Sequence, residues 1–511
     1  MKALLDAVLV DVGGTLVAQA PPGTPPTELE VVLRVDALID LQWMHESVRL
    51  GAVTNTAVMD EAQVRQLLGP SGISDELEAL VTSVDVGVEK PDPKPLLIAL
   101  ERLNLDVPER VLYIGDAPED EEAAAAAGVQ YLSITPMNGA TDLTIRQVVQ
   151  AWLERQAGHR FEEARARIAK SDIDAANQAA ALQAQLTKPP GALGRIEALG
   201  IQLAGITGEC PPPVPEPATV TVFAADHGVV DWGVSPWPQA VTAQMVANFA
   251  DGGAAINVLA RHAGAQVMTV DVGVATPIPE SARSQIVSRP IRKGTANLAA
   301  GPAMSRTDAL LALDVGAEMA DRAVGLGARC LLTGEMGIGN TTSAAAIIAG
   351  ITNRTPHDIT GRGSGADDEM LARKIAVIEA ATVGLSSTAG PLTLLETVGG
   401  FEIAALVGYI IGGAAERVPV IVDGVIGNAA LLVAVQFAPD AIDYVIAGHR
   451  STEPAAVAAL EFLDLQPVLD LDLRLGEGTG ATLALPIVQA AAKILREMAT
   501  FDGAGITDEK S

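Results

Sequence analysis

Apolar runs of strand length alternate with helical stretches through the first 155 residues. The alanine-rich stretch at 119–128 follows one of these runs and predicts a helix. The predicted strands cover residues 7–12, 50–56, 111–116 and 129–134. Because strands that alternate with helices favour a parallel sheet covered by helices, we expect an α/β domain here.

The pattern changes near residue 150. From 150 to 186, charged and apolar residues recur at spacings of three and four, which predicts helix. Further apolar runs at 218–226 and 330–333 predict buried strands. We therefore expect two domains with a boundary near residue 160. The ranges are 1–155 for the first domain, 156–186 for a helical connector and 163–505 for the second domain.

Composition excludes several classes of partner. The formal net charge of −29 argues against nucleic acid, because binding a polyanion requires clustered lysine and arginine. Neither of the two cysteines, Cys210 and Cys330, belongs to a CxxC pair, so we expect no disulfide framework and no zinc site. The apolar run at 403–415 is shorter than the roughly 20 residues that a membrane span needs. We expect a cytoplasmic protein that binds no membrane.

Residues suited to phosphoryl transfer stand near the ends of predicted strands in the first domain. Asp11 follows the first strand, Thr54 ends the second, and Lys90 opens a predicted helix. Asp116 and Asp120 follow the third strand. Transfer through an aspartyl intermediate needs a carboxylate nucleophile, a hydroxyl and a cation for the phosphoryl oxygens, and acidic ligands for Mg²⁺. In an open parallel sheet, these groups would meet at the carboxyl ends of the strands.

This arrangement resembles the haloacid dehalogenase (HAD) superfamily over residues ~5–135. The resemblance implies that Asp11 is the nucleophile, that Thr54 and Lys90 bind the phosphoryl group, and that Mg²⁺ is held by Asp11 and Asp116 with help from Asp120. Phosphatases of that superfamily carry a general acid two residues after the nucleophile, where this chain has Gly13. Without that acid, expulsion of a sugar alkoxide should slow by roughly 10²–10⁴-fold. The alternative is a domain without catalysis, which serves folding or docking.

Two glycine-rich loops in the second domain each precede an apolar helix. The first runs from Gly334 to Thr342, and the free N–H groups where its helix begins favour a phosphate or a carboxylate. In the second loop, glycines surround Glu477. A carboxylate isolated among glycines and apolar residues should be desolvated, which would raise its pKa toward a value useful for a general base. Taken alone, a loop of this kind is more commonly only a tight turn between strand and helix.

The two loops and several other segments, taken together in their order along the chain, indicate a protein family more specifically than either loop alone. The segments are TKPPGALGRIE at 187–197, FAADHGV at 223–229, GPAMSR at 301–306, GRGSGADDEMLARK at 361–374, VGGFE at 398–402 and VDG at 422–424. The set closely resembles nicotinate-nucleotide–dimethylbenzimidazole phosphoribosyltransferases over residues ~163–505. That resemblance implies an α/β fold with a parallel sheet and a small helical part, usually in a homodimer. It also implies displacement of nicotinate from nicotinate mononucleotide by a benzimidazole-type base, which gives α-ribazole 5′-phosphate in cobalamin synthesis without a cofactor.

The resemblance also implies roles for individual residues. Glu477 would take the proton of the incoming base, and Glu335 would orient the ribose or assist. Lys374 would offer positive charge to the carboxylate or phosphate of the nucleotide, and Trp237 would either stack on the base or serve ordinary packing. The remaining residues expected to bind substrate are Gly337, Gly339, Asn340, Thr341, Gly448, Arg450, Ser451, Gly476 and Gly478. The alternative is that the acceptor substrate is a base other than 5,6-dimethylbenzimidazole.

Asp226 and His227 end a predicted strand, and because no second histidine stands at ligand spacing we interpret them as a structural, hydrogen-bonded pair rather than a metal site.

A further hypothesis links the two domains. The expected transferase product is a phosphate monoester. A phosphatase domain on the same chain could remove that phosphate at a raised local concentration of product.

Overall fold

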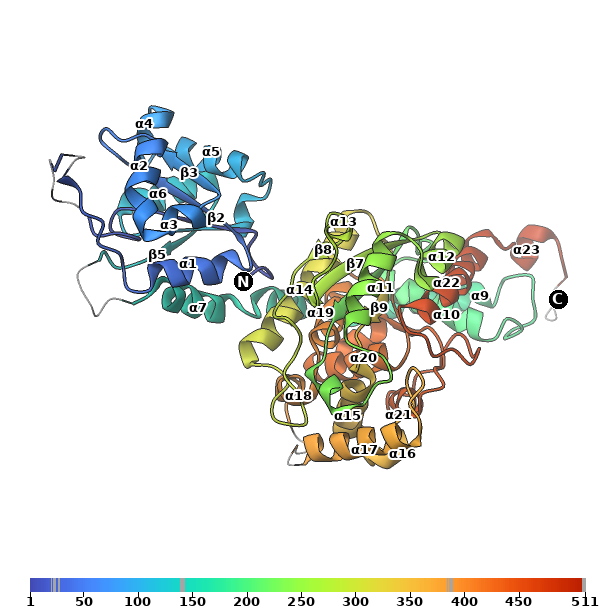
Figure 1. Cartoon of the computed structure of the whole chain (residues 1–511). Coiled ribbons are helices and arrows are strands. Elements are labelled where there is room, and N and C mark those ends of the chain that lie inside the picture. Colours follow the sequence, from blue (N-terminus) through green and yellow to red (C-terminus); the bar gives the residue numbers. More distant parts are fainter. Residues whose placement is uncertain are drawn as a thin grey trace. The chain divides into compact units, whose positions relative to one another are not determined.

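The computed structural model describes all residues except 20, 22–23, 26–27, 138–142, 384, 386–388 and 508–511. The chain divides into two compact units, Met1–Gln156 and Ala157–Ser511. Each is an α/β unit built on its own sheet (Figure 1).

Unit 1 contains a five-stranded parallel sheet in the order β3-β2-β1-β4-β5. Its strands are β1 Ala7–Val10, β2 Arg49–Thr54, β3 Ala79–Thr82, β4 Val111–Gly115 and β5 Gln130–Ser133. Its helices are α1 Ala37–His45, α2 Glu61–Leu68, α3 Ile73–Glu76, α4 Ser83–Val86, α5 Lys94–Arg102, α6 Pro118–Ala127 and α7 Ile145–Gln156, with 3-10 turns η2 Gly69–Ser71 and η3 Pro108–Arg110. The four strands predicted from sequence are present, and β3 adds a fifth.

Alternation along β1 explains how this sheet is covered on both faces. Val8 and Val10 belong to an apolar cluster that includes residues of α1, α2 and α7. Ala7 and Leu9 point into a second cluster built with α5 and α6. One correction applies here: α5 begins at Lys94, so Lys90 lies in the loop before the helix and does not open it.

Unit 2 contains a six-stranded parallel sheet in the order β11-β10-β9-β6-β7-β8. Its strands are β6 Ala218–Ala225, β7 Ala265–Gly273, β8 Val287–Ser288, β9 Cys330–Met336, β10 Val420–Val422 and β11 Val445–Ala447. Its helices are α8 His159–Arg167, α9 Ile173–Gln183, α10 Arg195–Thr207, α11 Ala240–Ala250, α12 Ala255–Ala263, α13 Glu280–Arg283, α14 Arg306–Gly325, α15 Asn340–Thr352, α16 Pro356–Ile359, α17 Asp368–Thr382, α18 Pro391–Val398, α19 Phe401–Ala415, α20 Val425–Phe437, α21 Pro454–Phe462, α22 Thr479–Glu497 and α23 Phe501–Ala504, with 3-10 turns η4 Gly228–Trp232 and η5 Pro439–Tyr444.

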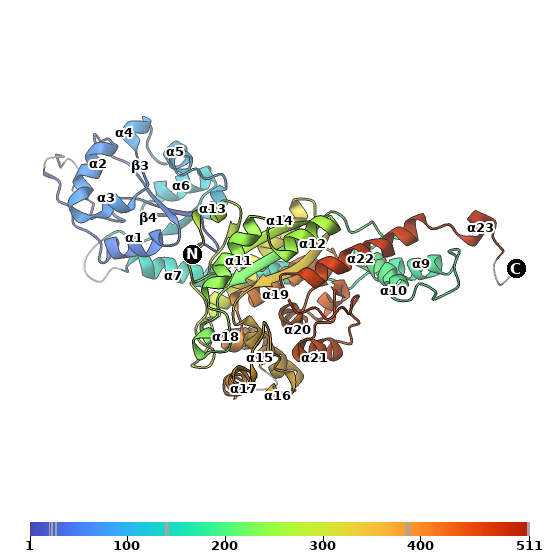
Figure 2. The ribbon, with the colours of Figure 1, turned by 45° about the vertical axis from the view of Figure 1, so that its right-hand side comes forward.

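The long helix α22 runs from the sheet to the group formed by α9, α10 and α23 at one end of unit 2 (Figure 2). The segment that we expected to connect the domains forms α8 and α9 of this unit. Asp314 of α14 fixes the start of α8, because its carboxylate accepts hydrogen bonds from the N–H groups of Gly158 and Phe161.

The apolar run at 403–415 is the core helix α19, which is buried on nearly its whole circumference. It crosses α14 at very short range. A Cβ added to Gly408 would lie 2.0 Å from the carbonyl oxygen of Leu313, and one added to Gly316 would lie 1.9 Å from that of Ala405. Glycine at both positions therefore allows the two backbones to touch. In the described part of the chain, no helix combines the length and apolarity that a membrane crossing requires.

Candidate functional site

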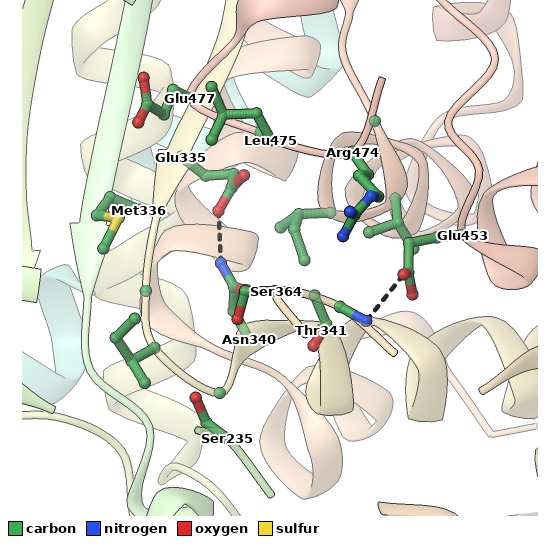
Figure 3. Close-up of a pocket in the computed structure, with 18 of the residues that line it drawn as sticks. Ser235, Glu335, Met336, Asn340, Thr341, Ser364, Glu453, Arg474, Leu475 and Glu477 are labelled. Carbon is green, nitrogen blue, oxygen red and sulfur yellow. Dashed lines mark hydrogen bonds between the residues drawn. The ribbon is translucent and has the colours of Figure 1, made fainter. Parts of the chain in front are cut away.

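A cavity of about 700 Å³ lies at the carboxyl ends of β9, β10 and β11 in unit 2. The glycine-rich loop before α15, the loop before α22 and the region around Lys374 supply most of its wall (Figure 3). Carboxyl ends of parallel strands are where open α/β sheets bind ligands, because loops diverge there and helices begin. The chemistry of the wall differs from one end of the cavity to the other.

Glu335 is one of the buried carboxylates of the cavity wall. It lies near the end of β9 and accepts a hydrogen bond from the side-chain amide of Asn340 (Figure 3). Burial, reinforced by the nearby charge of Asp423, raises the pKa of Glu335 to about 8. At neutral pH this side chain therefore carries its proton most of the time and can donate a hydrogen bond.

Glu477 stands in a strained loop that supplies a second buried carboxylate to the cavity wall. Its backbone is left-handed, with φ of 64°, between Gly476 and Gly478 at φ of 85° and 91°. Its carboxylate accepts a hydrogen bond of 3.3 Å from the N–H of Ile256, at the start of α12. Burial raises the pKa of Glu477, whereas this hydrogen bond favours its charged form.

Positive charge marks the opposite end of the cavity. Lys374 of α17 is buried, and its Nζ donates to Thr341 Oγ1 and to the carbonyl oxygen of Gly361, both at 3.1 Å. Burial lowers the pKa of Lys374. Glu453 accepts the N–H of Gly363 at 2.9 Å, and the guanidinium of Arg474 points into the space between Glu453 and Glu335 (Figure 3). This end suits an anion, which the free N–H groups at the start of α15 also favour.

Unit 1 brings its predicted residues together at the carboxyl edge of its own sheet. Lys90 Nζ lies 2.6 Å from Asp11 Oδ1 and 2.5 Å from Asp120 Oδ1. Asp116 Oδ1 accepts a 2.9 Å hydrogen bond from Thr15. Burial raises the pKa of Asp11 to about 7 against the opposing charge of Lys90.

Three of these groups could hold a cation. Carboxylate oxygens of Asp11, Asp116 and Asp120 all lie within 4.8 Å of one another. Such hard oxygen ligands suit Mg²⁺. Thr54 is buried at the end of β2, and a Cβ added to Gly13 would meet nothing within 4 Å. The space around residue 13 is thus open, where the HAD resemblance would place an acid.

Comparison with known proteins assigns unit 2 to a protein family. A family model described as phosphoribosyltransferase matches residues 168–506. The nicotinate-nucleotide–dimethylbenzimidazole phosphoribosyltransferase of Salinispora tropica is 52% identical over 362 residues, which are 68% of this chain and 100% of the relative. The enzyme of that name from Chloroflexus aggregans is 54% identical over 340 residues, 66% of this chain and 96% of the relative. The chain belongs to this phosphoribosyltransferase family.

A solved structure and a second family model complete the comparison. The phosphoribosyltransferase from Thermus thermophilus shares 45% sequence identity with a TM-score of 0.63, and the match covers 66% of this chain and 99% of that one. A model described as haloacid dehalogenase-like hydrolase matches residues 35–134. Unit 1 is therefore a HAD-like domain that precedes the phosphoribosyltransferase domain in the sequence. The match begins after Asp11, so the sequence motif around that residue lies outside it.

Most residues that the phosphoribosyltransferase resemblance singled out line the cavity. They are Trp237, Glu335, Gly337, Gly339, Asn340, Thr341, Lys374, Ser451, Gly476 and Glu477. Gly448 and Gly478 do not. A Cβ on Gly448 would lie 2.8 Å from Cα of Ala481, and one on Gly478 would lie 2.8 Å from the carbonyl oxygen of Thr333. These two glycines permit close packing behind the loops.

Arg450, which we expected to anchor phosphate, also stands outside the cavity wall. Its half-exposed side chain lies 3.8 Å from Asp470. The neighbouring His449 lines the cavity instead and is buried. Residues 445–447 form β11, so His449 follows a strand end that stays buried while Arg450 turns outward. Sequence reasoning favoured the charged residue and could have found His449 from the short apolar run before it.

Asp226 and His227 do not pair with each other. His227 Nε2 lies 2.6 Å from Glu402 Oε1 on α19, and Asp226 Oδ2 accepts the N–H of Ala275 at 2.8 Å. Both side chains are buried at the end of β6 and are held by different elements. This corrects the pairing while leaving them as hydrogen-bonded residues at a strand end.

Proposed function

We propose that unit 2 transfers the ribosyl 5′-phosphate of nicotinate mononucleotide to 5,6-dimethylbenzimidazole or a similar base. The observation that carries this proposal is that one cavity holds two buried carboxylates, Glu335 and Glu477, together with a basic, glycine-rich anion site. The relatives named above carry the same activity in their names. The cavity volume of about 700 Å³ also lies in the range of pockets that bind small molecules.

In this proposal the anionic end of the nucleotide binds near Lys374 and Thr341. The flat base enters beside Met245 and Met336, two apolar side chains of the cavity wall, and Met336 lies on the same side as Glu335 and Glu477 (Figure 3). One base nitrogen bonds to the anomeric carbon while the carbon–nitrogen bond to nicotinate breaks, and the electron pair of that bond stays on the pyridine nitrogen. The proton on the other base nitrogen passes to a carboxylate. Positioning and electrostatics supply most of the rate, because nicotinate leaves readily from a cationic ring.

Glu477 and Glu335 lie in different environments, and this difference assigns them different roles in the proposed reaction. The hydrogen bond from Ile256 at the start of α12 favours the charged form of Glu477, so we assign the base role to it. Glu335, with a pKa of about 8, is mostly neutral at pH 7 and would donate a hydrogen bond to the ribose or the base. Two carboxyl groups of one cavity that are held in different environments are the pattern expected of an acid–base pair.

Incubation of the protein with nicotinate mononucleotide and 5,6-dimethylbenzimidazole, followed by mass spectrometry, tests the proposal. We expect nicotinate and α-ribazole 5′-phosphate in equal amounts. Glu477→Gln should reduce turnover by roughly 10²-fold or more, since a positioned base contributes on that order. Full turnover in Glu477→Gln would overturn the base assignment, and absence of nicotinate release with several benzimidazoles would overturn the activity.

We also propose that unit 1 hydrolyses a phosphate ester with Mg²⁺. The cluster of Asp11, Asp116 and Asp120 with Lys90 supports this second activity. When bound, Mg²⁺ would offset negative charge on the phosphoryl group. Asp11 would attack the phosphorus while the ester P–O bond breaks and the leaving alkoxide takes a proton from water; a second water would then release phosphate from Asp11. Lys90 would hold a phosphoryl oxygen and keep Asp11 ionised against its raised pKa. The transferase product is a candidate substrate.

Loss of phosphate from α-ribazole 5′-phosphate, measured with and without Mg²⁺, tests this activity. We expect Mg²⁺-dependent release that Asp11→Asn abolishes. If Asp11→Asn releases phosphate as fast as the unaltered protein, Asp11 is not the nucleophile. If no phosphate ester is cleaved, unit 1 is the docking or folding module of the alternative hypothesis.

A further inference from the structure

Asp423 and His449 form a buried pair at the cavity that the roles proposed above do not use. Asp423 follows β10 and His449 follows β11, so neighbouring strands bring them to the same edge of the sheet. His449 Nε2 lies 3.5 Å from Asp423 Oδ1, and both side chains are at most 4% exposed. His449 lines the cavity, whereas Asp423 lies behind it.

The surroundings fix both side chains. Asp423 Oδ1 accepts a 2.9 Å hydrogen bond from the N–H of Ala481, in the first turn of α22. A Cβ on Gly480 would lie 1.9 Å from Cδ2 of His449, so the imidazole ring rests directly on that turn. Neither ring nitrogen of His449 has a hydrogen-bond partner among the residues that the structure describes. A buried imidazole whose nitrogens make no hydrogen bond is costly, and one that faces a cavity can bond to what binds there.

We propose that His449 contacts the ribosyl phosphate of the substrate and that Asp423 is a positioning residue for His449 and for the two carboxylates. This inference rests on the transferase activity proposed above. His449 lines the cavity with Gly424 and Ser451, and a Cβ on Gly424 would lie 3.3 Å from its Nε2 atom. A ring N–H there can donate to a phosphate or ribose oxygen, while Asp423 holds the other side of the ring.

Asp423 also acts through its charge. The groups that face it are His449 after β11, Glu335 on β9 and Glu477 before α22. Its negative charge raises the pKa values of both glutamates beyond the effect of their burial, and Glu402 of α19 adds to the effect on Glu335. Burial raises the pKa of Asp423 itself, and His449 opposes that rise. His449 therefore helps Asp423 to keep the charge that the glutamates sense.

The test is the pH profile of transferase kcat/KM in Asp423→Asn. Asparagine keeps the acceptor for the N–H of Ala481 and removes only the charge. Removal of a nearby negative charge lowers the pKa values of Glu477 and Glu335, so both limbs of the profile should move to lower pH, by about one unit. The control is Asp314→Asn, another buried carboxylate that accepts main-chain N–H groups, but outside the cavity wall. It should leave both limbs in place.

His449→Gln provides an independent measurement if Asp423→Asn fails to fold. Loss of a hydrogen bond to the nucleotide should raise KM for nicotinate mononucleotide about tenfold, with a smaller change in KM for the base. Equal loss of kcat at every pH in Asp423→Asn, with unmoved limbs, would overturn the charge role. An unchanged KM in His449→Gln would overturn the contact. If the unaltered protein shows no transfer at all, the proposed function fails instead.

Discussion

Gly476 lies so close to Glu335 that a Cβ on the glycine would fall 2.3 Å from the Oε1 atom of the glutamate. The loop before α22 and the end of β9 therefore meet without any side chain between them. This contact explains how Glu477, one residue later, comes to share the cavity with Glu335. The glycines of this loop serve the close approach of the loop to Glu335 as well as the left-handed backbone.

Gly476→Ala should displace the Glu335 carboxylate and lower transferase kcat by about 10-fold or more, since small misplacements of reacting groups are costly. The measurement is kcat at saturating substrates. Gly191→Ala is the matched control: Gly191 has a similar φ of 77°, but its added Cβ meets nothing within 4 Å. Both variants carry backbone strain, so only the clash with Glu335 separates them. Equal effects of the two would show that strain alone matters.

The raised pKa of Glu335 predicts that both activity and stability fall as pH rises. If neutral Glu335 donates a hydrogen bond during transfer, kcat should fall as pH rises through about 8, and Glu335→Gln should remove that alkaline limb. An alkaline limb that persists in Glu335→Gln would assign it to another group.

Stability should respond to the same proton. The folded protein holds it up to a pH of about 8, whereas the unfolded chain releases it near the ordinary value of 4.5. Between these two values the folded state binds more protons, so the free energy of unfolding should fall as pH rises through this window. Denaturant unfolding of the unaltered protein and of Glu335→Gln, compared between pH 5 and pH 8, measures this contribution. Equal slopes in the two proteins would contradict it.

How far the sequence predicted this structure depended on the range of the interactions. Local apolar runs indicated strands such as β1 and β9, and the order of motifs located Lys374 and Glu477. The partners of Asp226 and His227 could not be predicted, because Glu402 and Ala275 come from elements that only the folded chain brings close. The exclusion of Arg450 from the cavity likewise depends on the turn after β11.

The crossing of α14 and α19 predicts a large effect on stability. Gly408→Ala would place a methyl group 2.0 Å from the carbonyl oxygen of Leu313, so the helices would have to separate. We expect a loss of about 3 kcal/mol or more in the free energy of unfolding, at the upper end for overpacked cores. Gly325→Ala, at the end of α14 with open space around its Cβ, should be neutral or slightly stabilising. Thermal unfolding of both variants checks the prediction.

Gly13→Asp should show whether unit 1 lacks only a proton donor. The added side chain enters open space beside Asp11, so the fold should accept it. If the cluster of Asp11, Lys90 and Asp120 is otherwise competent, a carboxyl group at residue 13 should speed Mg²⁺-dependent hydrolysis of an alkyl phosphate by roughly 10²-fold. Gly13→Asn is the matched control, since it has the same shape without an ionisable proton. An increase in both variants would point to a steric effect, and an increase in neither would show that proton donation at this position does not limit the rate.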